Sequence, residues 1–347
     1  KVLTKEQTKD MTREIAGEKN FKIIEESGEY DFSISVESGE RFRVNAYKQR
    51  GNYAIAIRTI TSHIPDFDTL GLPEVLKTFA EKHKGLVLVT GPTGSGKSTT
   101  LASLINIINE NQQRHIITLE DPIEYVHSHK KSLVNQREIG QDTESFNSAL
   151  RAILRQDPDV VMVGEIRDAE TAGLAVQAAL TGHLVFSTLH TNSAAGILPR
   201  LLDMGIEPFL LASTLNVVIG QRLVRRITEK RELYKSSELE TKGINTIVGN
   251  LLPQDKESIA KVSEDLGYPG LPVKNEDHYM LARGVNSKET PGGYKGRAGL
   301  YETIEVDEDI QKLIINHSTA NDIMRLAKSK GTITMRQDGI LKVLSGI

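Results

Sequence analysis

A glycine-rich octapeptide that directly follows a short apolar run is the feature that most narrows the folds open to this chain. The apolar run covers residues 86–90, and the octapeptide is Gly91-Pro92-Thr93-Gly94-Ser95-Gly96-Lys97-Ser98. It matches the pattern G-x-x-x-x-G-K-[ST], in which backbone N–H groups surround phosphate oxygens at the start of a helix. We therefore expect residues 91–99, including Thr99, to bind ATP or ADP. Lys97 would reach the β- and γ-phosphates and Ser98 would ligate Mg²⁺. The alternative is a glycine-rich turn that binds nothing.

Short apolar runs alternate with helix-compatible stretches after this point. The expected strands cover residues 86–90, 115–119, 160–163 and 184–188, and a helix begins at Lys97. Such alternation predicts a parallel sheet in an α/β fold. Residues 225–274 are charged and poorly periodic, so we expect an irregular surface excursion there. From Glu305 to the end the sequence is compatible with helices.

The first part of the chain has a different pattern. From about Asn20 to Ile60, apolar and polar residues alternate, and Gly28, Gly39 and Gly51 lie between the alternating stretches. This predicts antiparallel strands in a small α+β domain, with a linker near residues 65–73. A chain of 347 residues suits two domains. We place them at 1–72 and 73–347.

Composition excludes several classes of function. The net charge is only −3, which gives no general case for nucleic-acid binding, and the chain has no cysteine, so disulfides and thiolate metal sites are excluded. The apolar runs are too short to cross a membrane. We expect a cytoplasmic protein that meets a membrane only through partners.

Two carboxylate clusters follow expected strands, where they could serve the phosphate site. Glu165 comes after the strand at 160–163 and is the candidate to hold Mg²⁺ and prepare the attacking water. Glu124 ends the cluster Glu120-Asp121-Pro122-Ile123-Glu124 and could act as general base. The alternatives are a solvated Glu165 beside a helix-capping Asp168, and a turn capped by Asp121.

His183 and His190 flank the expected strand at 184–188. Metal ligation would need a third ligand, and the spacing suggests none. We expect both side chains to contact phosphate or the acidic cluster.

The segment 41–60 predicts a hairpin centred on Arg50 and Gly51. This register pairs Arg43 with Arg58 directly across the strands. On the opposite face, inward packing is expected for Phe42, Val44, Ala46, Ile55 and Ile57. Like charges placed opposite each other destabilise a sheet unless an anion lies between them. We infer that both arginines reach a nucleotide on a neighbouring subunit and stabilise transition-state charge. The alternative is two solvated arginines splayed apart.

These residues together resemble the PilB/PilT/GspE family of type IV pilus and type II secretion motor ATPases, over nearly the whole chain. Residues 91–98 resemble the family's Walker A motif, 118–125 its Asp box, 157–168 its Walker B motif, and 181–191 its His box. The resemblance implies a RecA-like ATPase domain after a small PAS-like domain. It makes Glu165 the Walker B glutamate, Glu124 the catalytic Asp-box glutamate, and Arg43 and Arg58 the interface arginines.

The family also implies a homo-hexamer that acts on an inner-membrane platform protein of a pilus or secretion machine, at the cytoplasmic face. Residues 201–213, 221–226 and 296–302 resemble the assembly and secretion branch, whereas the short N-terminal domain resembles the retraction branch. Members of the first branch usually carry four zinc-binding cysteines after the position of Arg226; this chain has none, so no zinc is expected.

The leading interpretation is an ATP-hydrolysing hexameric motor for pilus assembly or secretion. The alternatives are a pilus retraction ATPase of the same family and a scaffold that binds nucleotide without turnover. A P-loop small-molecule kinase would leave the two arginines unexplained.

Overall fold

A computed structural model describes residues 2–36, 40–60 and 63–347. The chain divides into two compact units. The first unit combines Lys1–Ile64 with Asn109–Gly164, and the second combines Pro65–Ile108 with Glu165–Ile347. Among the described residues, no helix is both long and apolar enough to cross a membrane.

The N-terminal part of the first unit is one helix packed on a small antiparallel sheet. A capping box between Thr4 and Gln7 starts the helix, and Gly28 ends it in the left-handed conformation with φ 91°. The sheet has the strand order β1-β2-β3, and Phe21, Ile24, Phe32 and Val44 are buried between helix and sheet. The elements are α1 (Lys5–Ser27), β1 (Glu29–Ser35), β2 (Arg41–Gln49) and β3 (Asn52–Ile60).

The hairpin prediction is confirmed in its register. Strands β2 and β3 flank Arg50 and Gly51, whose positive φ values of 50° and 73° suit a two-residue turn, and Arg43 lies opposite Arg58. The expected burial of Ile57 is wrong, because its side chain is 53% exposed. It lies two positions beyond Ile55, which is the last residue of β3 in the cluster beneath α1. The predicted turn at Gly39 lies outside the described residues.

The rest of the first unit consists of three parallel strands and a helix. The strand order is β7-β5-β6, with parallel pairing of β5 to both neighbours. Two of these strands were expected, but β6 was missed because its sequence, LVNQRE, is mostly polar and only Val134 and Glu138 are buried in it. The elements are β5 (His115–Glu120), β6 (Leu133–Glu138), α4 (Phe146–Ile153) and β7 (Val160–Val163).

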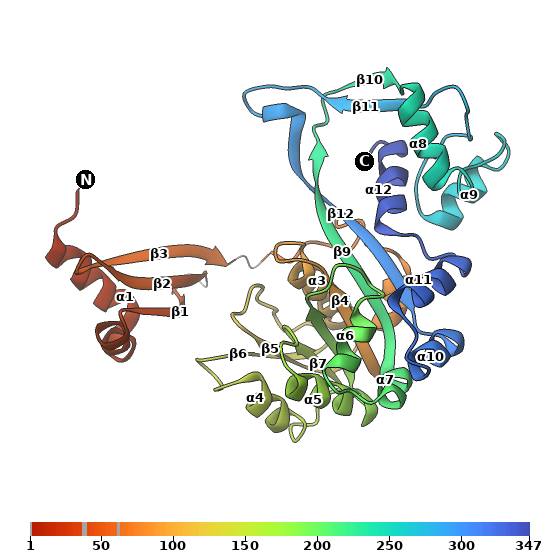
Figure 1. The fold of residues 1–347 in the computed structure, drawn as a ribbon. Helices are drawn as coiled ribbons and strands as arrows, with labels where there is room; N and C mark the ends of the chain where they lie inside the picture. The colour runs from red at the N-terminus through yellow and green to blue at the C-terminus, as the bar shows by residue number, and fades with distance from the viewer. Residues whose placement is uncertain (1, 37–39, 61–62) are drawn as a thin grey trace. The chain divides into compact units, whose positions relative to one another are not determined.

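The second unit contains the glycine-rich loop and a run of neighbouring strands in the order β12-β9-β4-β8. Strand β4 pairs in parallel with β8 and β9, and the long strands β9 and β12 run side by side in antiparallel pairing (Figure 1). The prediction of a parallel-dominated α/β sheet is confirmed. The elements are α2 (Val75–Ala80), β4 (Gly85–Thr90), α3 (Lys97–Asn111), α5 (Ala169–Leu180), β8 (Leu184–Leu189), α6 (Ile197–Asp203), α7 (Pro208–Thr214), β9 (Leu215–Ile227) and β12 (Tyr294–Glu305).

The expected irregular excursion between β9 and β12 is wrong, because this segment is folded around its own apolar cluster. Ile244, Val248, Leu271 and Tyr279 are buried there with Leu341 from the C-terminal helix. These apolar residues come from separate segments, so no local periodicity revealed them. The elements are β10 (Arg231–Lys235), α8 (Glu238–Val248), α9 (Ile259–Leu266), β11 (Met280–Gly284) and the short 3₁₀ helix Pro291–Gly293. The predicted C-terminal helices are confirmed as α10 (Glu308–Ile315), α11 (Ala320–Ser329) and α12 (Met335–Leu344).

Candidate nucleotide site

The glycine-rich loop leaves the sheet at the carboxyl end of β4, beside the carboxyl end of β8. Thr90 Oγ1 donates to Leu189 O over 3.1 Å, and the Thr191 N–H donates to Thr90 Oγ1 over 2.9 Å. Strand ends of a parallel sheet form the usual ligand crevice of this class of fold. These bonds bring His190 and Thr191 to the same edge as the loop.

The loop itself has the shape of a phosphate cradle. Gly91 has φ 152°, and a Cβ added there would lie 2.3 Å from Gln221 O, so only glycine fits. The buried Ser95 Oγ has no hydrogen-bond partner among the described residues. Lys97 Nζ donates to Gly91 O and Pro92 O, at 3.0 and 3.2 Å, which holds the ammonium over the loop. An unsatisfied hydroxyl and a folded-back lysine inside a glycine turn fit a phosphate group. Ser98 is exposed in the first turn of α3, where its hydroxyl is available to Mg²⁺.

Gln221 on β9 supports the loop from behind, and the sequence analysis did not identify it as a site residue. Its Nε2 donates to Ser95 O over 2.9 Å, and its Oε1 accepts from Thr100 Oγ1 over 2.8 Å. The side chain is 2% exposed. A single amide therefore joins the loop to the first turns of α3. The available signal was a glutamine directly after the apolar residues of a buried strand.

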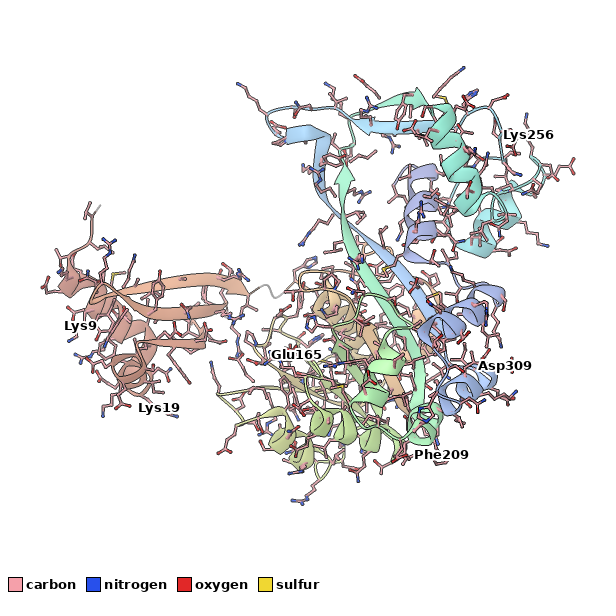
Figure 2. The ribbon with its side chains drawn as sticks, in the orientation of Figure 1. Lys9, Lys19, Glu165, Phe209, Lys256 and Asp309 are labelled. Carbon is pink, nitrogen blue, oxygen red and sulfur yellow. The ribbon has the colours of Figure 1, made fainter. Side chains whose placement is uncertain are left out.

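Glu165 follows β7 (Figure 2). It lies at the carboxyl end of β8, beside the glycine-rich loop, because the next residue, Ile166, donates its N–H to Thr188 O. Its carboxylate accepts from Arg167 over 2.5 Å and lies 3.4 Å from His190 Nε2. Partial burial alone would raise the pKa of Glu165, but the hydrogen bond and charge of Arg167, together with His190, lower it below its ordinary value. Glu165 is therefore ionised at neutral pH. Asp168 caps α5 by accepting from the Thr171 N–H over 2.8 Å, which leaves Glu165 as the acid of this segment at the phosphate edge.

His183 does not lie with this group. It precedes β8, and its carbonyl accepts from the Gly85 N–H at the start of β4, whereas the glycine-rich loop follows the end of β4. The two ends of β4, Gly85 and Thr90, are five residue steps apart, about 17 Å at the usual rise of a strand. His183 Nδ1 lies 2.9 Å from Ala178 O, beyond the end of α5. The prediction that His183 contacts a nucleotide bound by the same chain has no support from this placement.

In the first unit, Glu124 lies exposed on the loop that follows β5. Side chains from β5 and β6 hold the backbone of this loop. Glu138 Oε2 accepts from the Ile123 N–H over 3.1 Å, and Gln136 bonds both Tyr125 O and the His127 N–H, at 2.8 and 2.7 Å. Glu120 accepts from the Glu124 N–H. The candidate base therefore lies on a short loop whose backbone is held by several hydrogen bonds from side chains of β5 and β6.

Two buried titratable groups beside this loop have strongly shifted pKa values. Burial raises the pKa of Glu120 to about 7, although hydrogen bonds from Thr118, Gln136 and the Glu124 N–H oppose the shift. Burial, reinforced by the charge of Lys130, lowers the pKa of His127 to about 4. Folding therefore favours the neutral form of both side chains.

These shifts predict opposite pH dependences of stability. A raised Glu pKa contributes stability that is lost as pH rises from about 4.5 to about 7, whereas a lowered His pKa contributes stability that is lost as pH falls from about 6.5 to about 4. In urea unfolding between about pH 4.5 and 6.5, Glu120→Gln should gain stability relative to wild type as pH rises, by up to about 1.4 kcal/mol per pH unit. His127→Gln should lose stability by a similar amount. Curves that run parallel to wild type for both variants would contradict the assignment.

Arg43 and Arg58 lie opposite each other on the exposed face of the small sheet. Arg43 is 3.7 Å from Asp31, and its side chain is 44% exposed. Arg43 also lines a small pocket together with Asp121 and Pro122 of the Glu124 loop. The two predicted arginines are therefore adjacent, and one of them lies near the loop of the candidate base in the same unit. The glycine-rich loop, Glu165 and His190 form a separate group in the second unit.

The comparisons with known proteins agree with this architecture. The family model described as Type II/IV secretion system protein matches residues 24–347. The type IV pilus retraction ATPase PilT of Pseudomonas aeruginosa is 45% identical over 286 residues, covering 80% of this chain and 81% of PilT. Type II secretion system protein E of the same bacterium is 45% identical over 267 residues, covering 77% of this chain and 47% of that protein.

A solved structure gives the same result for the fold. The crystal structure of the pilus retraction motor PilT with bound ADP aligns with a TM-score of 0.66 at 36% identity, covering 94% of this chain and 80% of the PilT chain. The expected RecA-like ATPase fold with a small α+β N-terminal domain is confirmed. The resemblance drawn from the motifs is confirmed as well.

Proposed function

The chain belongs to the family of Type II/IV secretion system proteins, and from this premise we propose that it hydrolyses MgATP to drive a pilus or secretion machine. The observation that carries the proposal is the glycine cradle near the ionised Glu165, with a buried Ser95 hydroxyl that has no partner in the part of the chain that the structure describes. A phosphate cradle and an acidic group at the same sheet edge suit phosphoryl transfer to water. Relatives named as ATPases support hydrolysis rather than nucleotide binding alone.

Each of these residues would have a distinct role in the reaction. Backbone N–H groups of residues 91–99, other than Pro92, would bind the phosphates, and Lys97 would leave the loop carbonyls to pair with the β- and γ-phosphates. Ser98, and Glu165 through water, would hold Mg²⁺, which would neutralise charge on the phosphates. Glu124 accepts the proton of the attacking water, and Arg43 and Arg58 stabilise negative charge on the γ-phosphoryl group. His190 orients Glu165, from 3.4 Å away.

We also propose the assembly that these roles need. Domain 1–72 of one subunit would present its arginines to domain 73–347 of the next, in a ring of six that binds a platform protein at the cytoplasmic face of the membrane. The opposed Arg43 and Arg58 support the shared site, because a bound anion would relieve the repulsion between their like charges.

The direction of the mechanical work has two candidates. Pilus retraction is supported by PilT, which this chain matches over most of the PilT length. Pilus assembly or secretion, favoured by the sequence motifs, is supported by the equal identity to protein E, of which the chain covers about half. Cells that lack the protein should accumulate surface pili if it retracts them and lose pili if it assembles them.

The test of the ATPase itself is steady-state phosphate release per subunit over a wide range of protein concentrations, with Glu165→Gln as the blank. A ring with shared sites should show activity that rises cooperatively with concentration and disappears in the variant. Phosphate release that is flat with concentration and equal in the variant would leave a nucleotide-binding scaffold and overturn the motor proposal.

A further inference from the structure

Glu138 joins two parts of the first unit that are far apart in sequence. It ends β6, and its side chain is 4% exposed. Oε1 accepts from the Ser33 hydroxyl on β1 over 2.7 Å, and Oε2 accepts from Arg41 on β2 over 2.7 Å. The same Oε2 accepts from the Ile123 N–H, one residue before Glu124. One buried carboxylate thus touches both the N-terminal sheet and the loop of the candidate base.

We propose that Glu138 is a positioning residue through which the N-terminal sheet sets the position of Glu124. This inference rests on the proposed function, in which Glu124 is the base. Arg41 and Ser33 hold the carboxylate from one side, and the carboxylate fixes the Ile123 amide on the other. A charge-assisted contact that is almost fully buried is strong enough to select one loop position. Movement of the sheet away from β6 would release Glu138 and loosen the loop.

The surrounding bonds explain why this release would act on Glu124 in particular. Gln136 and Glu120 hold the loop at residues 124–127 through groups of β5 and β6 themselves. At Ile123, the side chain that holds the loop also contacts the N-terminal sheet, through Ser33 and Arg41. Gln141 Nε2 adds a further bond to Ser33 O over 3.2 Å, which keeps β1 beside the residues that follow β6. Through Glu138, the N-terminal sheet is therefore connected by hydrogen bonds to the first part of the loop.

The experiment uses full-length chains with Arg41→Ala and Ser33→Ala, which change residues on the N-terminal sheet and spare the buried Glu138. Ser35→Ala is the matched control, because Ser35 is an exposed residue on the same face of β1. Hydrogen exchange of the peptide that covers residues 120–127 should speed up about 10-fold in Arg41→Ala and less in Ser33→Ala, with no change in the control. In the same variants kcat should fall roughly 10-fold with KM for ATP unchanged, since a shifted base affects the chemical step.

Faster exchange together with lower kcat supports the proposal. Unchanged exchange in Arg41→Ala overturns it, whatever happens to kcat, and so does faster exchange with an unchanged kcat. A lower melting temperature alone, with kcat per folded subunit preserved, would show a structural contact only and would also overturn it. Failure of the proposed function would appear separately, as wild-type phosphate release no greater than that of Glu165→Gln. The exchange comparison does not depend on turnover.

Discussion

Glu124→Gln should lower kcat for MgATP hydrolysis by about 10²- to 10⁴-fold, the range that general-base catalysis usually contributes. The amide cannot accept a proton from the attacking water, but it preserves the volume of an exposed loop residue. The anchors of the loop act on its backbone and on neighbouring side chains, so the variant should keep its fold. ATP affinity should change less than about threefold, because the proposed phosphate site is the glycine-rich loop and not the loop of Glu124.

Phosphate release and binding of a fluorescent ATP analogue would check this prediction. Glu144→Gln is a matched control, because Glu144 is an exposed carboxylate of the same unit outside the candidate site. A Glu124→Gln enzyme with kcat within about twofold of this control would remove the base assignment, given the magnitude expected for such a group.

Arg58→Ala should lower kcat for MgATP hydrolysis by about 10³-fold or more, while nucleotide still binds. An arginine that neutralises charge on a transferring phosphoryl group acts in the transition state and adds little to ground-state affinity. Measured alone, this loss does not tell which subunit supplies the arginine. Mixing two inactive variants does.

Subunits of Arg58→Ala and Glu124→Gln should partly restore activity when they are mixed and reassembled. If the arginine comes from a neighbour, a site is complete where an Arg58→Ala subunit supplies Glu124 and the next subunit, Glu124→Gln, supplies Arg58. In an equal random mixture, roughly a quarter of the sites are of this kind. If both groups act within one chain, every mixed site lacks one of them. A mixture as inactive as either variant would therefore place the arginine in its own chain, near the loop with which Arg43 already shares a pocket. Arg325→Ala, at an exposed position of α11, serves as the control for loss of a surface arginine.

The differences between sequence and structure follow from the range of the interactions involved. Strand β4 was predictable because a parallel strand covered on both faces is a continuous apolar run. Strand β6 was not, because it has polar residues that bond the neighbouring loop instead of packing in a core. The segment between β9 and β12 was misjudged for a related reason. Its core unites separate segments with Leu341 of the C-terminal helix, so no stretch of it shows a full apolar face.

The candidate site divides in the same way. The motif of residues 91–98 and the register that opposes Arg43 to Arg58 depend on neighbours in sequence or on one tight turn, and both could be predicted. Gln221 could not be recognised as a support of the glycine-rich loop, because it is 126 residues from Ser95. Likewise, the sequence does not distinguish His183 from His190, because both flank the same strand. They lie at opposite ends of it, and only the pairing of β8 with β4 shows which end holds the loop.

By itself the sequence determined the phosphate cradle, the parallel α/β class and the arginine hairpin. Each of these features follows from a short sequence pattern, because the steric or hydrophobic interactions that produce it involve residues close together in the sequence. The tertiary structure alone decided which carboxylates and amides hold the segments of the candidate site. Glu138 meets Ser33 and Arg41 across 105 and 97 residues of chain. Contacts of that kind depend on the order in which strands pair, and hydrogen bonds between side chains so far apart leave no periodic trace in the sequence.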